Sequence, residues 1–163
     1  MFARLALTLF AAALVATPAR ADVEADFRRG LSAYNTGDYA AAYRLWLPLA
    51  EQSEPRAEAG VGFMLFRGLG VALDDRAAAR WLTRAAEHGQ AEGQLMLGLL
   101  YYYGRGVERS YVRSFAWCDL ATTNGNADAS LCRDASLESM SASDHDEAFR
   151  LVVELQSRQP ARR

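Results

Sequence analysis

Hydrophobic residues in this chain recur at the spacing of amphipathic α-helices. The first such set follows the N-terminal segment and consists of Val23, Phe27, Leu31 and Tyr34. The second set begins after a short polar break and consists of Ala42, Leu45, Trp46 and Leu49. Glycine ends helices by taking a left-handed conformation, and aspartate begins them by capping free N–H groups. Gly37 and Asp38, which lie between the two sets, therefore predict a turn between two helices.

A related helix-turn-helix pattern then appears twice, and the two copies are 36 residues apart. The first copy contains Gly62, Leu65, Gly68, Gly70, Val71, Ala78, Trp81, Ala85 and Gly89. The second copy contains Gly98, Tyr101, Gly104, Gly106, Val107, Ser114, Trp117, Ala121 and Gly125. Repetition at one fixed period is typical of solenoids, in which each unit buries its apolar face against its neighbours. We therefore predict an all-α fold, a right-handed α-solenoid of antiparallel helical hairpins.

The predicted repeat domain spans residues 22–158 and contains four hairpins. Their expected bounds are 22–53, 55–89, 91–125 and 127–158. Ser141 and Asp144 form a capping-box pattern that begins the last helix, and we expect this helix to cover the open end of the stack. Residues 159–163 are expected to form a frayed basic tail.

Residues from the third hairpin to the start of the fourth are shared with a known family. They are Leu97-Gly98, Tyr101-Tyr102, Gly104, Gly106-Val107, Trp117, Ala121 and Gly125-Asn126-Ala127. With them the chain resembles the Sel-one-like repeat family, a branch of the tetratricopeptide superfamily, over nearly all of residues 22–158. In this superfamily the first helix of each pair lines a concave face. The resemblance therefore implies a partner-binding groove lined by Phe63, Arg67, Leu99 and Tyr103, whereas the alternative for each side chain is packing against the next repeat.

The function that this resemblance implies is binding of a protein or peptide partner by a non-enzymatic module. A second hypothesis is an envelope enzyme or ligand binder, because some cysteine-rich secreted relatives are linked to penicillin binding and weak β-lactam hydrolysis. Those relatives carry a cysteine pair in every unit, but this chain has a single pair at a different spacing. A third hypothesis is a scaffold for a larger envelope complex. Turnover of the β-lactam nitrocefin separates the second hypothesis from the other two.

The N-terminal segment has the pattern of a secretory signal peptide. Residues 1–21 contain an early arginine, an apolar run from Leu5 to Ala16 and the small-residue ending Ala19-Arg20-Ala21. We expect cleavage after Ala21 and export to the periplasm or beyond, and a retained membrane anchor is the alternative. The apolar run is shorter than a membrane-spanning helix requires, and no later stretch is longer. No membrane span is therefore expected after cleavage.

The charge and the cysteines of the chain limit its chemistry further. Every basic residue is arginine, and the formal net charge is −2, so we expect no nucleic-acid partner and no lysine-based catalysis. Cys118 and Cys132 lie seven residues on either side of Gly125, at similar heights on two facing helices. In an exported protein this placement allows a disulfide, and two small buried thiols are the alternative.

No set of residues in the sequence has the spacing of a catalytic or metal site. His88 ends a repeat, His145 begins the last helix, and neither has a partner at metal-ligand spacing. The Gly-x-Gly loops follow helices rather than strands, and the chain lacks the lysine of a phosphate-binding loop. We therefore predict no catalytic residues, no metal and no cofactor.

Overall fold

The computed structural model describes residues 18–160, and over this range all regular structure is helical. The eight helices of this range are α1 (Pro18–Asn35), α2 (Tyr39–Glu51), α3 (Pro55–Arg67), α4 (Asp75–Glu87), α5 (Ala91–Tyr103), α6 (Tyr111–Thr123), α7 (Ala129–Glu138) and α8 (Ala142–Arg158). Most of the predicted signal peptide lies outside the described residues. No helix of the described range is long and apolar enough to cross a membrane.

The second helix of each of the first three pairs begins at a polar capping residue, as the sequence predicts for Asp38. The side chains of Asp38, Asp74 and Ser110 accept hydrogen bonds from N–H groups in the first turns of α2, α4 and α6. The helices α3 and α5 end at Gly68 and Gly104, whose φ angles are +67° and +68°. Most residues are strained at such angles, so glycine sets the helix ends here.

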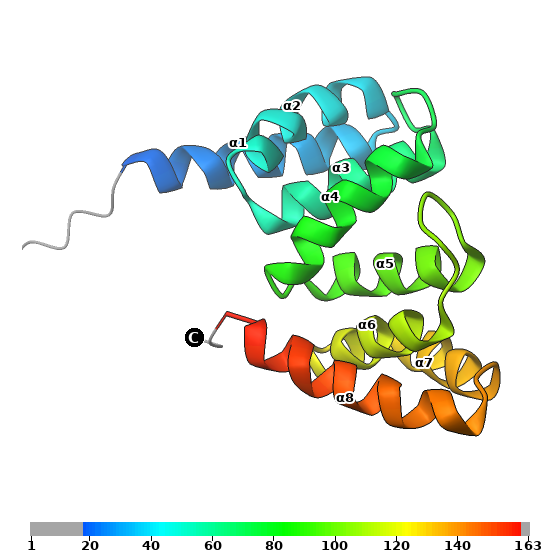
Figure 1. Cartoon of the computed structure of the whole chain (residues 1–163). Helices are drawn as coiled ribbons and strands as arrows, with labels where there is room; N and C mark the ends of the chain where they lie inside the picture. Colours follow the sequence, from blue (N-terminus) through cyan, green and yellow to red (C-terminus); the bar gives the residue numbers. More distant parts are fainter. Residues whose placement is uncertain (1–17, 161–163) are drawn as a thin grey trace, which may run out of the picture.

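Consecutive helices pack against one another from α1 to α7, and α3 and α5 also contact the first helix of the following pair. This arrangement is a helical solenoid, and it confirms the predicted fold class (Figure 1). The buried core forms two clusters. One cluster centres on Trp46, Val61 and Met64, and the other includes Leu97 and Leu120.

Glycines permit the closest approaches between the elements of the stack. A Cβ atom added at Gly62 would lie 2.7 Å from Leu82 Cγ, and one added at Gly98 would lie 2.3 Å from Cys118 Sγ. The loop glycine Gly106 lies against the backbone at the start of α4, so each long loop is anchored on the preceding repeat.

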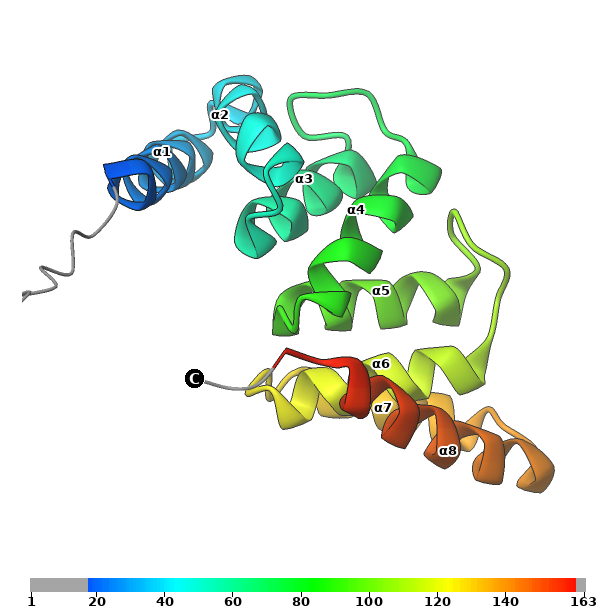
Figure 2. The same ribbon diagram turned by 60° about the vertical axis from the view of Figure 1, so that its left-hand side comes forward.

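The C-terminal helices differ from the predicted fourth hairpin. The helix α8 packs mainly against α6, whereas α7 and α8 make few contacts with each other. Figures 1 and 2 show α8 running alongside α6, and its C-terminal end reaches toward the α4–α5 turn. The expectation that α8 covers the end of the stack is therefore corrected, because α8 covers a flank of α6. It packs there because Ala148, Val152 and Leu155 join the buried cluster that contains α6.

The expected frayed tail is also corrected at its first residue. The side chain of Gln159 donates a hydrogen bond to the carbonyl of Ala86 at 3.3 Å and accepts one from Gln94 Nε2 at 3.1 Å. These amide contacts hold Gln159 against the end of α4. Residues 161–163 lie outside the described range.

Candidate interaction surface

The four residues of the predicted groove differ in their exposure. Phe63 and Leu99 are half-buried and pack against the C-terminal core cluster. Arg67 is exposed, and its side chain has no hydrogen bond or ion pair with the described residues. Tyr103 is 65% exposed, which makes it one of the most exposed large side chains of the described range. Two of the four residues thus serve the fold in part, while Arg67 and Tyr103 are available to a partner.

Tyr103 belongs to a cluster of three tyrosines, which we call the tyrosine cluster: Tyr102, Tyr103 and Tyr111. The ring centroids of Tyr102 and Tyr103 are 5.1 Å apart in an edge-to-face arrangement. The rings of Tyr102 and Tyr111 are 5.3 Å apart. Tyrosine side chains lose little entropy on binding and offer both an apolar ring and a hydroxyl, so they are frequent anchors at protein interfaces.

The local backbone brings the three tyrosines together. The helix α5 ends at Tyr103 because Gly104 takes the left-handed conformation and its N–H donates to the carbonyl of Leu100. The chain then returns, and the N–H of Ser110 donates to the carbonyl of Tyr101 at 2.9 Å. Because Ser110 also caps α6, Tyr111 becomes the first residue of that helix and lies beside the end of α5.

One arginine of the loop contacts the tyrosine cluster, and a second one fixes the loop against the preceding repeat. The guanidinium carbon of Arg109 lies 5.6 Å from the centre of the Tyr111 ring. Arg105 binds the carboxylate of Asp75 through two contacts of 2.6 and 3.0 Å and stacks over Phe66 at 4.0 Å. A paired guanidinium of this kind fixes geometry as well as charge. The loop is therefore held against the start of α4, and this contact fixes the position of the tyrosine cluster beside the loop.

Sequence reasoning found Tyr103 but missed Arg109 and Tyr111 as its neighbours. These two residues belong to the loop and to the start of α6, and hydrophobic periodicity carries no information about them. The available signal is the pair Gly104 and Ser110. A left-handed helix end and a helix cap that follows it by six residues return the backbone to α5.

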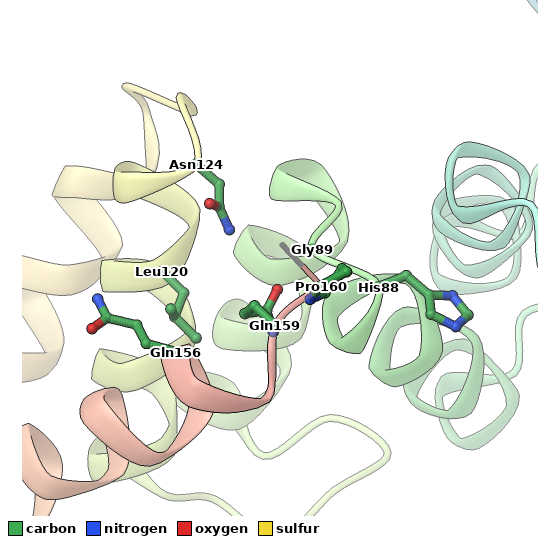
Figure 3. Close-up of a pocket in the computed structure, with 7 residues that line it drawn as sticks. All are labelled: His88, Gly89, Leu120, Asn124, Gln156, Gln159 and Pro160. Atoms are coloured by element: carbon green, nitrogen blue, oxygen red, sulfur yellow. The ribbon is translucent and has the colours of Figure 1, made fainter. Parts of the chain in front are cut away.

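A hollow of about 510 Å³ lies where the C-terminal end of α8 meets the turn after α4. It is lined by His88, Gly89, Leu120, Asn124, Gln156, Gln159 and Pro160 (Figure 3). Figure 3 shows the side chains of Asn124 and Gln159 near each other, while the His88 ring turns away from them. None of the four predicted groove residues lines this hollow or a second one, of about 660 Å³, at the α2–α3 turn.

The His88 ring turns instead toward a buried carboxylate. Glu58 is fully buried, and its Oε2 lies 2.7 Å from His88 Nδ1. Its Oε1 lies 2.9 Å from Arg84 Nη2 but makes no hydrogen bond with described residues. That Arg84 nitrogen is directed at the carbonyl of Ala50, at 3.1 Å, so we regard the Arg84–Glu58 contact as charge attraction without a hydrogen bond. Glu58, Arg84 and His88 connect the start of α3 to the C-terminal ends of α2 and α4. These residues form no motif in the sequence.

The cysteines are placed as the sequence analysis allowed. Cys118 on α6 and Cys132 on α7 face each other, with Cα atoms 5.9 Å apart. This separation lies in the usual range for a disulfide, so the pair is able to form one. The described residues contain no group of three or more metal-ligating side chains that could hold an ion.

The fold and this surface define the class of the protein, a helical repeat solenoid with an exposed aromatic edge. The Sel1 repeat model matches residues 55–90 and 91–126. The structure is similar to that of a protective antigen present in uropathogenic Escherichia coli strains, described as displaying an SLR fold. The TM-score is 0.81 and the identity 30%, covering 86% of this chain and 31% of that one. A Sel1 repeat protein from Oxalobacter formigenes is similar with a TM-score of 0.64 and 25% identity, covering 79% of this chain and 55% of the other.

These comparisons confirm the resemblance that the sequence pattern indicates, because residues 55–126 match two Sel1 repeats and the structure is similar to those of two Sel1-like repeat proteins. Sel1 repeats are typical of protein-interaction modules, and their fold is typically a non-enzymatic scaffold. The chain spans about a third of the E. coli structure and about half of the Oxalobacter structure. No protein of curated function matches it.

Proposed function

We propose that this protein is an exported, non-enzymatic interaction module of the bacterial envelope, and that it binds a protein or peptide partner through the tyrosine cluster and the adjacent groove residues. The observation that carries the proposal is the exposed Tyr103 ring, which is held by Tyr102 on a braced loop edge. Exposed aromatic side chains are favoured as anchors when their surroundings fix them before binding, because less entropy is lost on association.

The adjacent residues extend this surface along the first helices of the repeats. Phe63 contacts Tyr34 of α1, with ring centroids 6.4 Å apart, so aromatic side chains continue from α3 to α1. Arg67, at the end of α3, occupies the position 36 residues before Tyr103, and its guanidinium is exposed and makes no ion pair with the described residues. In this proposal Phe63 and Leu99 form the floor of the groove, and Arg67 and Tyr103 are the side chains that a partner reaches first.

Export is part of the proposal and is supported by two observations. The N-terminal segment has the pattern of a signal peptide, and the Cys118–Cys132 pair is able to form a disulfide, which persists in oxidising compartments. The E. coli structure with the same fold is that of a protective antigen. No observation in the structure favours β-lactam hydrolysis.

A site-specific photo-cross-link in cells tests the proposed surface. A photoreactive residue at Tyr103 should capture a specific partner, identified by mass spectrometry. The matched control is the same residue at Arg44, which is exposed on α2 away from the tyrosine cluster. The partner's affinity should then fall at least tenfold in the Tyr103→Ala, Tyr111→Ala variant. Equal capture at both positions, or an unchanged affinity, would show that the partner binds elsewhere or that this surface binds none.

A further inference from the structure

The helix α7 occupies the position of a repeat helix but lacks the apolar residues of one. Residues 36 apart are equivalent in the repeats, so α7 can be compared directly with α5. At three equivalent positions α5 carries Met96, Leu97 and Leu100, all buried. At these positions α7 carries Cys132, Arg133 and Ser136. The apolar contacts that hold α5 in the stack are therefore largely missing from α7.

The side chains that α7 does bury are small. Its buried residues are Ala129, Cys132 and Ser136, and its larger Leu131 is 76% exposed. Leu137 is half-buried against the core and is the largest apolar contact of the helix. Because the stabilisation from burial scales with the apolar area removed from water, this face contributes little.

The residues around the cysteine pair are small and leave room for its sulfur atoms between α6 and α7. Cys118 is fully buried and Cys132 is 7% exposed. Gly98 of α5 has no side chain, and this absence leaves room for Cys118 Sγ. Beside the sulfurs, the hydroxyls of Ser114 and Ser136 are 2.7 Å apart. The contact between α6 and α7 is thus built around the cysteine pair and two serines.

We propose that the Cys118–Cys132 disulfide forms in the protein and is the bond that docks α7, so that its reduction releases α7 while α8 stays seated on α6. The helix α8 is expected to stay because its own apolar residues enter the core and because it makes few contacts with α7. The reductant is a dithiol. Its first thiolate attacks one cysteine sulfur and breaks the S–S bond, its second thiol closes a cyclic disulfide, and both cysteines leave as thiols with the two dithiol protons.

Release of α7 would also change the edge that carries the tyrosine cluster. Ser139, directly after α7, has its Oγ 3.5 Å from the Tyr102 hydroxyl. This contact is lost when α7 leaves. The docking of α7 itself, however, can be measured without any partner, so its test is independent of the proposed function.

Hydrogen exchange followed by mass spectrometry tests the proposal on the mature protein before and after treatment with dithiothreitol. Intact mass after alkylation establishes that both cysteines were bridged before treatment and that both are free after it. We expect amides of α7 to exchange at least tenfold faster after reduction. Amides of α3 and α4, and those of α8, should change less than threefold. Two free thiols before treatment, or unchanged exchange in α7 after it, would overturn the proposal, as would equal acceleration in α7 and α8.

A variant without cysteines provides the matched control. Cys118→Ala, Cys132→Ala should show the fast α7 exchange of the reduced protein, and dithiothreitol should change it no further. Slow exchange in α3 and α4 establishes that the variant is folded. Protection of α7 in this folded variant equal to that of the oxidised protein would show that packing alone docks the helix.

Discussion

The second repeat, residues 55–90, and the third, residues 91–126, share their loop glycines and the positions of their helix caps, but the exposed faces of their second helices differ. Three positions on one side of α4 carry Arg76, Arg80 and Arg84, and the equivalent positions on α6 carry Val112, Ala116 and Leu120. Arg76 and Arg80 are exposed, whereas Ala116 and Leu120 are buried. The repeat pattern therefore sets where the helices lie. The side chains at these three positions of the second helix determine whether another helix can pack on it. The helix α8 docks on α6 because α6 carries an apolar stripe at the positions where α4 carries arginines.

The two repeats also differ where their helices end. In the second repeat, buried Glu58 meets His88 and Arg84. In the third repeat, Gln94 takes the position of Glu58 and Asn124 takes that of His88, and Asn124 Nδ2 donates to Gln94 Oε1 at 2.8 Å. The same junction is thus made from charged groups in one repeat and from amides in the next. Amides need less compensation for lost hydration, so the third repeat can bury its junction under Gln159.

The largest expected effect comes from giving α6 the surface of α4. Ala116→Arg places a long charged side chain at a fully buried position between α6 and α8. Overpacking and an unpaired buried charge should together lower the free energy of unfolding by roughly 3 kcal/mol or more. Urea unfolding gives the loss of stability, and limited proteolysis should show α8 cleaved first.

The equivalent position on α4 supplies the control for this variant. Arg80→Ala removes an exposed side chain and should change stability by no more than about 0.5 kcal/mol. If Ala116→Arg were equally mild, or if it left α8 resistant to protease, the apolar stripe would not be what seats α8.

The sequence predicted those parts of the molecule that local chemistry determines. The fixed period, the turn at Gly37 and Asp38 and the repeated glycines sufficed for the solenoid, because caps and turns act within a few residues of their own positions. The placement of α8 was predicted wrongly, since amphipathic periodicity shows that a helix has an apolar face but does not name the surface that receives it. A comparison of Arg80 with Ala116 across the period contains that information.

The candidate site was predicted less completely than the fold. Tyr103 was identified because the family resemblance indicates which face of its helix is exposed to a partner. Tyr111 was not identified, because it joins the tyrosine cluster only when the loop after α5 brings the chain back to that helix. The Glu58–His88 contact joins residues 30 apart in the sequence, and it depends on the angle between helices. Such contacts follow from packing and leave no short motif.

The second largest effect should come from removing the buried carboxylate. Glu58→Ala leaves His88 and Arg84 without their partner, and we expect a loss of about 2 kcal/mol in the free energy of unfolding. This loss of stability is smaller than the loss expected on breaking a fully buried ion pair, because the side chains of His88 and Arg84 are both partly exposed to solvent.

Replacing the charged junction by the amide junction sharpens the same comparison. Glu58→Gln, His88→Asn copies the third repeat and should cost about 1 kcal/mol or less, because the amides can pair as Gln94 and Asn124 do. Denaturant unfolding at neutral pH measures both variants. A double variant as unstable as Glu58→Ala would mean that the two repeats are not interchangeable at this position.

A smaller effect than that of Glu58→Ala should come from each of the helix caps at equivalent positions in the two repeats. Asp74→Ala and Ser110→Ala each remove the side-chain acceptor of one N–H group, so each should lower the free energy of unfolding by about 1 kcal/mol. Because the two caps lie in separate loops, their costs should add in the double variant. Asp74→Asn keeps an acceptor oxygen and should lose only a few tenths of that amount, which makes it the matched control. A much larger cost at Ser110 than at Asp74 would indicate that the third repeat depends on its cap for more than helix initiation, since the start of α6 also carries Tyr111.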